Sequence, residues 1–494
     1  MYQKLSRLLR NISVENDEIN FFRKWLFIGL GLHVICALFS TGFFHFDEQW
    51  QILEFLGAKL GKTTYDVLPW EYRFKMRSWT QPGIYYLLFK PFIYFGMDNP
   101  FTLATIARLF SSLIGWFSLV LISFAAYFMF ENKSERMWAV RLLCVTYFIP
   151  FIHARPSSEA FGSSFFLAGL SLLIIVNALE KKQKEISSWW LFGIGFIMGL
   201  SFTFRFQMGF VILFTWIWYV VWGSRNWVKI TLLALGVVMG VLVELPIDRW
   251  GYGEWTVSAW NYLDQNIIQN KASNFPTAPW YYFITKSITR IVLPISLLIV
   301  PAWLIFWFKR PKHLITFGTL PLVIIHSIIA AKAFRYLIPI APLTPIILVE
   351  MNKIIPEKYL QKSMVFFKIC LVVNCVLLVG VLFRSAKSVI AMHEYVYDNR
   401  ISLINYTEES PYSMLGLPLN FYKSSFLEMK SWDSYENLEK QKGWVFLGKG
   451  EKILSFLKNN KCVLKYSTYP KFALNFNYFK WVERSRFWAL FFCE

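Results

Sequence analysis

The chain has 494 residues, of which 56% are hydrophobic, 19% are aromatic and only 17% are charged, and its mean hydropathy is +0.41. Soluble domains carry about 25% charged residues, so this composition excludes an ordinary soluble protein and favours an α-helical polytopic membrane protein. The net charge of +20 would suggest nucleic acid in a soluble chain. Cytoplasmic loops of membrane proteins also collect Lys and Arg, and the sequence has no zinc-finger, helicase or RNP motif, so we expect no nucleic-acid partner.

The N-terminal part of the chain contains the basic residues Lys4, Arg7, Arg10, Arg23 and Lys24 and is expected to stay in the cytoplasm. The first apolar run is too long for a signal-peptide core and lacks a small-residue cleavage site, so it is predicted to remain as an anchor. Apolar runs of spanning length predict about eleven transmembrane helices in all. They are 24–44, 103–129, 137–153, 160–179, 188–204, 207–223, 228–246, 288–308, 313–331, 335–350 and 365–384. A piece at 83–96 is too short to span and is predicted to be amphipathic or re-entrant.

The connections between these runs follow the positive-inside rule. Five short basic connections are predicted to be cytoplasmic: ENKSER (131–136), EKKQKE (180–185), GSRNWVK (223–229), KRPKH (309–313) and NKIIPEKYLQK (352–362). The first long loop, 45–100, and the second, 247–285, then lie on the extracytoplasmic side with the tail 385–494. Strand-like runs in the tail (GWVFLGKG, KCVLKYSTY and FWALFFCE) alternate with polar helical pieces. They predict a small extracytoplasmic α/β domain of about 110 residues after a transmembrane domain, 1–384.

The six cysteines fall into two groups. Four lie inside apolar runs, where small buried hydrophobic side chains are expected: Cys36, Cys144, Cys370 and Cys375. Cys462 and Cys493 lie in the polar tail and form one disulfide if that part is extracytoplasmic, a question that the sequence leaves open.

Charged residues that interrupt the apolar runs gather on the predicted extracytoplasmic face. They are Asp47, Glu48, Glu71, Arg73, Lys75, Arg77, Arg155, Glu159, Arg205, Asp248, Arg249, Lys332 and Arg335. Charges at membrane depth are costly and usually face a cavity or a partner, so this convergence predicts a site. Arg and Lys there favour an anionic ligand such as a lipid phosphate, and carboxylates beside them can accept a hydroxyl proton. With the tryptophans of the same loops, the pattern indicates sugar transfer from a lipid phosphate to a hydroxyl.

Simpler interpretations stay open for each element. The loop tryptophans suit an interfacial aromatic belt, and Lys332 suits the flank of a span. Arg155 with Glu159, and Asp248 with Arg249, suit structural ion pairs. Asp47 and Glu48 suit a solvated helix end. The sequence has no Walker A loop, no HExxH and no Gly-x-Ser-x-Gly, which disfavours ATP-driven transport, zinc proteolysis and serine hydrolysis.

The first loop resembles the family 22 glycosyltransferases, the lipid-linked mannosyltransferases of N-glycan and GPI-anchor assembly. Their motif of His-Pro-Asp-Glu, Trp-Glu-Tyr/Trp, Arg-Ser and Pro stands here as His45-Phe46-Asp47-Glu48, Trp70-Glu71-Tyr72, Arg77-Ser78 and Pro82. The DEQWQ wording is closest to the third-mannosyltransferase branch of GPI-anchor assembly. Later landmarks recur in family order over residues 40–345, as ARPSSEAFG, FRFQMGF, DRWGYGEWTVSAWNYLDQNI and AKAFRYLIPIAPL. Phe46 replaces the usual Pro, and Ala331 and Ala333 stand where His and Glu are common, which leaves the acceptor and the sugar open.

The resemblance implies a GT-C fold whose catalytic domain, 1–384, moves mannose from a polyprenyl- or dolichyl-phosphate donor to a hydroxyl of a glycan or glycolipid, with inversion to an α-linkage. It implies that Asp47 is the general base. Glu48 is the second catalytic candidate, and three roles stay open for it: it orients the acceptor, tunes the acidity of Asp47 or pairs with an Arg of the first loop. The candidates for binding the donor phosphate and the substrates are Arg77, Arg205, Lys332, Arg335, Glu71, Trp70, Arg155 and Asp248. A lipid phosphate leaves readily when cations hold its charge, and two adjacent acids make a poor metal site. No cofactor or metal is therefore expected.

Two other classes of function stay open: a polytopic lipid or glycan transporter, and a non-catalytic subunit of a glycan-assembly complex. Transporters commonly show paired repeats and charges near the bilayer midplane, whereas this chain shows no evident repeat and its charges gather at one face. The membrane is expected to be the bacterial inner membrane, with the site facing the periplasm, or the endoplasmic reticulum, with the site facing the lumen. Compact loops and the lack of a retrieval signal favour the bacterial alternative.

Overall fold

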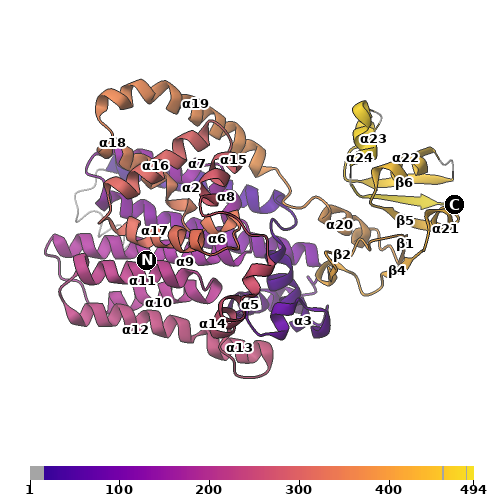
Figure 1. Ribbon diagram of the computed structural model, residues 1–494, viewed down its shortest axis with the longest axis horizontal. Helices are drawn as coiled ribbons and strands as arrows, with labels where there is room; N and C mark the ends of the chain where they lie inside the picture. Colours follow the sequence, from indigo (N-terminus) through magenta and orange to yellow (C-terminus); the bar gives the residue numbers. More distant parts are fainter. Residues whose placement is uncertain (1–15, 459–460, 475, 486) are drawn as a thin grey trace. The chain divides into compact units, whose positions relative to one another are not determined.

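The structure is a computed structural model that describes residues 16–458, 461–474, 476–485 and 487–494 (Figure 1). The basic residues Lys4, Arg7 and Arg10 lie outside the described residues. The described chain divides into two compact units. The helical unit comprises 16–40, 74–81 and 107–384, and the mixed unit comprises 41–73, 82–106 and the described part of 385–494.

Long apolar helices dominate the helical unit, because a helix satisfies all of its backbone polar groups internally. Among the described residues, five helices are long and apolar enough to cross a membrane: α2 (Asn16–Phe39), α6 (Pro100–Met129), α9 (Ser158–Lys181), the continuous α12 (Trp227–Leu242) and α13 (Glu244–Tyr252), and α19 (Glu357–Leu382). The other helices are α7 (Lys133–Val145), α8 (Phe148–His153), α10 (Trp189–Phe204), α11 (Met208–Trp218), α14 (Ser258–Leu263), α15 (Tyr282–Arg290), α16 (Ile295–Lys309), α17 (Leu314–Ile328) and α18 (Thr344–Ile354). The predicted count of about eleven spans therefore stays a prediction.

Proline interrupts two of the predicted spans. The prediction of one continuous helix over 335–350 is wrong, because 3-10 turns precede α18 there. Pro339 and Pro342 lack the N–H that a helix needs and clash with the preceding turn. The prediction over 288–308 is also wrong, because the chain leaves the helix between α15 and α16, around Pro294.

The predicted span 137–153 is broken by a contact between distant parts of the sequence. Helix α7 ends at Val145 and α8 begins two residues after Thr146. Asn374 of α19 donates its Nδ2–H to the carbonyl of Val145 at 2.8 Å and accepts the N–H of Tyr147 at 3.0 Å. This amide satisfies two backbone groups at the break, which would otherwise be costly in an apolar interior.

Helices α10 and α12 meet at backbone contact through glycines spaced four residues apart. A Cβ at Gly195 or Gly199 would collide with the backbone of α12, and one at Gly236 or Gly240 would collide with the backbone of α10. Small residues at this spacing let two apolar helices approach closely and make many van der Waals contacts. In a lipid environment such packing holds helices together, because the hydrophobic effect does not drive their association there. The two helices therefore form a tightly joined pair.

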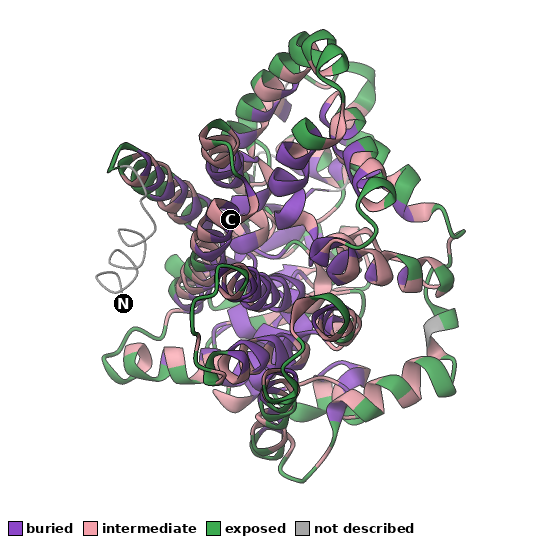
Figure 2. Cartoon of the chain, turned by 90° about the vertical axis from the view of Figure 1, so that its left-hand side faces the viewer, coloured by how far each residue is buried: buried purple, intermediate pink, exposed green. Residues whose placement is uncertain are grey.

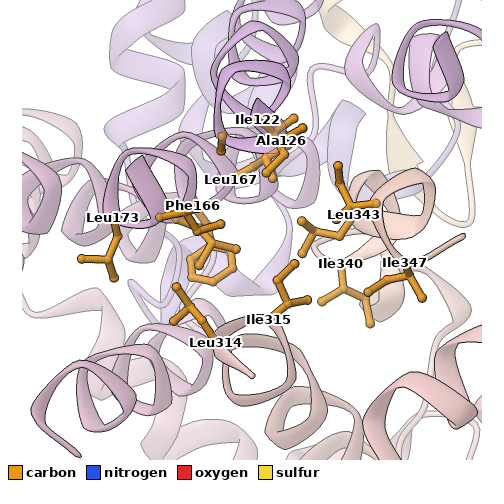
Figure 3. Packing of buried hydrophobic residues seen from close by; sticks show 14 of the residues in the cluster. Ile122, Ala126, Phe166, Leu167, Leu173, Leu314, Ile315, Ile340, Leu343 and Ile347 are labelled. Atoms are coloured by element: carbon orange, nitrogen blue, oxygen red, sulfur yellow. The ribbon is translucent and has the colours of Figure 1, made fainter. Parts of the chain in front are cut away.

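The core of the helical unit is aliphatic and aromatic (Figure 3). It includes Ile122 and Ala126 of α6, Phe166, Leu167 and Leu173 of α9, Leu314 and Ile315 of α17, and Ile340, Leu343 and Ile347 around α18. Other helices are far more exposed: in α12 with α13, and in α19, only 28% and 22% of the most apolar stretch is buried. Figure 2 shows exposed residues along the outer faces of many helices. Apolar faces of this kind are unfavourable in water, so the unit is suited to a bilayer.

The mixed unit contains a five-stranded sheet in the order β4-β1-β5-β7-β6. Strand β1 (Leu403–Tyr406) runs parallel to β4 (Glu428–Ser431) and β5 (Gly443–Leu447), whereas β7 (Ala489–Cys493) runs antiparallel to β5 and β6 (Cys462–Ser467). A short hairpin joins β2 (Ser413–Met414) and β3 (Leu417–Pro418). The helices of this tail are α20 (Ile390–Asp398), α21 (Tyr435–Glu439), α22 (Gly450–Lys458), α23 (Lys471–Leu474) and α24 (Trp481–Arg484). The predicted strands GWVFLGKG, KCVLKYSTY and FWALFFCE are confirmed as β5, β6 and β7.

A disulfide joins Cys462 of β6 to Cys493 of β7, which face each other in the sheet register. The sequence left this pairing open. The bond ties the edge strand β6 to its neighbour β7, beside a small core that contains Val445, Phe456 and Phe491.

The first long loop also belongs to the mixed unit up to Arg73. It forms the π-helix η1 (Glu48–Leu53), which continues directly into α3 (Glu54–Lys59), and then the single turn α4 (Trp70–Arg73). Helix α5 (Thr80–Tyr94) follows and contains most of the predicted short piece at 83–96.

Candidate active site

Asp47 lies in the mixed unit, in the helical turn that leads into η1. Its side chain is 14% exposed, whereas the residues of η1 are buried. The backbone N–H of Asp47 donates to His45 Nδ1 at 3.2 Å, and the same nitrogen lies 3.3 Å from Asp47 Oδ1. Asp47 is thus a partly exposed carboxylate beside the ring of His45.

Glu48 has different surroundings from its neighbour, because it is only 1% exposed. Its Oε2 accepts the backbone N–H of Phe44 at 3.2 Å and so closes the turn that precedes η1. Phe46 packs its ring 5.3 Å from the ring of Trp50, which is itself buried. The two adjacent acids therefore differ, with one turned partly toward solvent and the other holding the turn.

Trp70 and Glu71 open α4 in the same unit. Glu71 is 9% exposed, and its Oε1 accepts from Gln51 Nε2 at 3.0 Å. Gln51 lies on η1, four residues after Asp47. Trp70 is half-buried beside it. The structure thus brings the Trp-Glu-Tyr part of the motif against the helix that follows Asp47.

Arg205, Arg335 and Glu159 form a buried cluster in the helical unit. Nη2 of Arg205 lies 3.2 Å from Glu159 Oε1, and Nε of Arg335 lies 3.3 Å from the same oxygen. The exposed fractions of the three side chains are 5%, 14% and 2% in that order. Both guanidinium groups also lie over the ring of Tyr336, at 5.6 and 5.8 Å from its centroid. Two guanidinium groups and one carboxylate carry one net positive charge, and burial strengthens its effect on a nearby anion.

Interruptions of the helices place these three side chains. Arg205 has an extended backbone (φ −145°, ψ 105°) in the gap between α10 and α11. Arg335 lies in the 3-10 turn before α18, and Glu159 lies in the first turn of α9. Non-helical backbone at such depth is tolerated where it is buried in protein or lines a polar cavity.

Arg77 is held by residues of the second loop within the helical unit. The hydroxyl of Tyr252 donates to the carbonyl of Arg77 at 2.6 Å, and the Arg77 guanidinium lies 5.3 Å from the ring centroid of Tyr262. Gln207 Nε2 donates to the Tyr262 hydroxyl at 2.6 Å. Gln207 follows Arg205 by two residues, so Arg77 and the segment that contains Arg205 both contact Tyr262.

Asp248 fixes a backbone group and also shares a side-chain hydrogen bond with Glu244. It is fully buried in α13, its Oδ1 accepts the N–H of Trp79 at 2.7 Å, and its Oδ2 accepts from the Ser258 hydroxyl. The Trp79 ring lies edge-on to Trp250 and Tyr252 at 5.9 Å. Asp248 therefore clamps the segment after Arg77 to the second loop.

Two predicted cations likewise donate to backbone carbonyls. Arg155 Nη2 donates at 2.5 Å to the carbonyl of Ser40, just past the end of α2, where the helix dipole favours a cation. Lys332 Nζ donates to the carbonyls of Ala278 at 2.7 Å and Ile329 at 2.6 Å. The structure places both cations where they join separate segments of the helical unit.

Sequence reasoning missed several buried charges, among them Arg108 and Glu54. Arg108 of α6 is 4% exposed, and its Nε donates to the carbonyl of Ala37 at 2.8 Å. Glu54 of α3 is 2% exposed and accepts hydrogen bonds from Gln49 and from the backbone of Phe421. The signal in both cases was a lone charge inside an apolar stretch, in LATIARLFSS and in WQILEFLG.

Each unit holds one cluster with its own chemistry. In the mixed unit a carboxylate can take a proton from a hydroxyl, and in the helical unit two guanidinium groups can hold an anion. Among the described residues, no group of three or more His, Cys, Asp and Glu side chains is placed to hold a metal ion.

A model of the Alg9-like mannosyltransferase family matches residues 24–412. The protein named mannosyltransferase APTG1 from Arabidopsis thaliana is 24% identical over 323 residues, which cover 64% of this chain and 56% of that protein. GPI alpha-1,2-mannosyltransferase 3 from Danio rerio is 23% identical over 351 residues, which cover 69% of this chain and 60% of that protein. The chain thus spans less than two thirds of the length of these relatives.

A solved structure shares the fold. ArnT from Cupriavidus metallidurans, crystallised with undecaprenyl phosphate, superposes with a TM-score of 0.57 at 13% sequence identity, over 96% of this chain and 97% of that one. At this identity the likeness shows the fold alone, which is of the GT-C type with a small C-terminal sheet.

Proposed function

Because the chain belongs to the Alg9-like mannosyltransferase family, we propose that it is an inverting glycosyltransferase that moves mannose from a polyprenyl- or dolichyl-phosphate donor to a hydroxyl of a glycan or glycolipid. The proposed partners are the lipid-linked donor, the acceptor glycan and the surrounding membrane lipid. The relatives named as mannosyltransferases support the sugar, and ArnT, whose crystals contain undecaprenyl phosphate, supports the class of donor.

The observation that carries the proposal is the meeting of Arg205 and Arg335 at one oxygen of Glu159. A lipid phosphate gains negative charge as the bond between the sugar and the phosphate oxygen breaks. Guanidinium groups bind phosphate through planar, charge-assisted hydrogen bonds, and their charge acts strongly where water is excluded. Fixing them in advance on Glu159 avoids reorganisation when the charge develops.

Asp47 is proposed as the general base. The acceptor oxygen attacks the anomeric carbon on the face opposite the phosphate, its proton passes to the Asp47 carboxylate, and the lipid phosphate departs with the electron pair of the broken C–O bond. A β-linked donor gives an α-linked product by this route. The base must lie within hydrogen-bond reach of the acceptor hydroxyl, which requires a carboxylate with some access to solvent.

The other predicted residues take supporting parts in this proposal. Glu48 closes the turn beside the base, and Glu71 with Trp70 supports η1. Arg77, over Tyr262, is proposed as a further contact to the anionic donor. The remaining three, Asp248, Arg155 and Lys332, are proposed to shape the site through the backbone bonds they make.

The proposed site faces the extracytoplasmic side, either the periplasm of a bacterial inner membrane or the lumen of the endoplasmic reticulum. The disulfide between Cys462 and Cys493 supports this side for the sheet, because such bonds persist in oxidising compartments.

The test replaces the native chain in its source cells by Asp47→Asn and analyses the glycolipids. Asparagine keeps the shape but cannot take the proton, so we expect an unmannosylated acceptor to accumulate at a normal level of the protein. Asp66→Asn, an exposed acid of the same loop, is the matched control and should leave the glycolipids unchanged. Normal glycolipids with Asp47→Asn would contradict the assignment of the base.

Two outcomes would point to the other classes of function. A defect that wild-type protein corrects only in the presence of another purified subunit would indicate a non-catalytic member of a complex. Movement of an intact lipid-linked sugar across vesicles, without change to its linkage, would indicate a transporter.

A further inference from the structure

A buried acid follows Asp47 in the same helix. Glu54 opens α3, which continues η1 without a break, and it is 2% exposed. Its chain neighbours Phe55 and Leu56 are fully buried. A carboxyl group is stable at this depth only when hydrogen bonds replace the water that it has lost.

Glu54 accepts hydrogen bonds from the far end of the chain and from its own helix. Its two oxygens lie 3.1 and 3.2 Å from the backbone N of Phe421, which donates, although 367 residues separate them. Gln49 Nε2 donates to the same carboxyl at 2.9 Å. Phe421 is fully buried, and the ammonium of Lys62 lies 5.5 Å from its ring centroid. Burial raises the pKa of the Glu54 carboxyl to about 8, so that the group is mainly uncharged at neutral pH.

Two further hydrogen bonds join the first loop to the same short segment. Trp50 Nε1 donates to the carbonyl of Pro418 at 2.9 Å. Asn420 Nδ2 donates to Thr63 Oγ1 at 2.9 Å. Residues 418–421 therefore contact the first loop before and after Glu54.

A second contact fixes the other side of Asp47. The backbone N–H groups of Ala386 and Lys387 donate to the carbonyl of Thr41 at 2.8 and 3.1 Å. Gly42 has φ +80°, and a Cβ there would collide with the backbone of Lys387. Asp47 thus lies on a short stretch of chain between two contacts with the C-terminal residues, all within the mixed unit.

We propose that the segment 418–422 positions the helix of Asp47, and that Glu54 is the positioning residue through which it acts. The inference rests on the proposed function and gives the C-terminal residues a part in the transfer reaction. A general base works only within hydrogen-bond reach of its proton, and a displacement of about 1 Å is enough to lower the rate about 100-fold. Glu54 itself touches no substrate; it holds the helix from which the base projects.

The experiment compares Glu54→Ala, Glu54→Gln and Trp50→Phe with wild-type protein, purified at full length. The donor is radiolabelled polyprenyl-phosphate-mannose, and the acceptor is the glycolipid fraction that accumulates in the Asp47→Asn cells. For each variant kcat and donor KM are measured per folded protein, together with hydrogen exchange at the amides of 418–422. Glu428→Ala, an exposed residue of β4, is the control.

Glu54→Ala should lower kcat about 100-fold, leave the donor KM within about threefold, and expose the amide of Phe421 to exchange. Glu54→Gln should keep kcat within about twofold, because the amide oxygen still accepts from Phe421 and the amide of Gln49 can turn to pair with it. Trp50→Phe loses one hydrogen bond and should lower kcat severalfold. The control should match wild type.

The result that overturns the inference is an unchanged kcat in Glu54→Ala while exchange at 418–422 rises, since the contact would then be lost without consequence and the proposed function would still stand. Equal losses in Glu54→Gln and Glu54→Ala would also overturn it. A wild-type protein that transfers no mannose would instead refute the proposed function, and the positioning role with it.

Discussion

Arg205 and Arg335 come from segments 130 residues apart and meet at one carboxylate oxygen, 3.2 and 3.3 Å from Glu159 Oε1. The arrangement explains how two like charges stay together in a buried place, because the carboxylate offsets their repulsion.

Glu159→Gln should therefore affect both stability and donor binding. Breaking a buried ion cluster costs about 3–5 kcal/mol, so the thermal midpoint should fall, and the donor KM should rise as the guanidinium groups move apart. Thermal unfolding and donor titration check this. Glu180→Gln is the matched control, because Glu180 pairs with Lys229 at 2.7 Å in the same unit. If the donor KM of Glu159→Gln is unchanged, whatever the stability of the variant, the cluster does not take part in donor binding.

The raised pKa of Glu54 predicts that the stability of the protein depends on pH. Its pKa is raised by burial from 4.5 to about 8, so between these values the folded protein binds more protons than the unfolded chain. Stability should then fall as the pH rises from about 4.5 to 8 and level off above. Thermal midpoints measured at intervals over this range should decline less in Glu54→Gln, which has no proton to lose. Curves that run parallel for the two proteins would show that Glu54 does not titrate in this way.

Comparison of the sequence with the structure shows what periodicity can and cannot predict. The strands β5, β6 and β7 were predictable in place and type, because short aromatic runs between polar pieces are typical of strands, whereas their exact limits were not. Hydropathy also located the membrane-type helices. It did not predict the breaks within them, which arise at the prolines of 335–350 and at the Asn374 contact between α7 and α8. The family resemblance predicted from the first-loop motif is confirmed by the match over residues 24–412.

The candidate site was predictable in part. Sequence reasoning named Arg205 and Arg335, together with Lys332 and Arg77, as candidate cations for the donor phosphate, since they interrupt apolar runs on one predicted face. It could not predict that Glu159 joins them, or that Asp248 bonds to the backbone of Trp79, because partners of charged side chains depend on helix packing. Glu54 was missed for the same reason: its partner Phe421 lies 367 residues away.

Metal removal should leave the transferase active. Arginines, rather than a divalent ion, are proposed to hold the charge that develops on the lipid phosphate. Treatment of the purified protein with EDTA should therefore not change the rate, and added Mg²⁺ or Mn²⁺ should not raise it. Loss of activity on chelation, restored by either ion, would contradict this part of the account.

Removal of the disulfide should weaken the sheet but not the chemistry. Cys462 and Cys493 are 31 residues apart, and a loop of that length corresponds to about 3–4 kcal/mol of stabilisation. A double Cys→Ser variant should show faster hydrogen exchange in β6 and β7 at nearly normal kcat. Cys375→Ser, which changes an exposed free cysteine, should behave as wild type. Unaltered exchange in the double variant would show that the bond adds nothing to the sheet.

The most direct test of the central claim is the anomeric configuration of the product. Purified protein is given a β-linked polyprenyl-phosphate-mannose and the acceptor from the Asp47→Asn cells, and the new linkage is read by NMR. The account predicts an α-linked mannose with wild-type protein and no transfer with Asp47→Asn. A β-linked product, or transfer that continues at the wild-type rate without the Asp47 carboxylate, would contradict it.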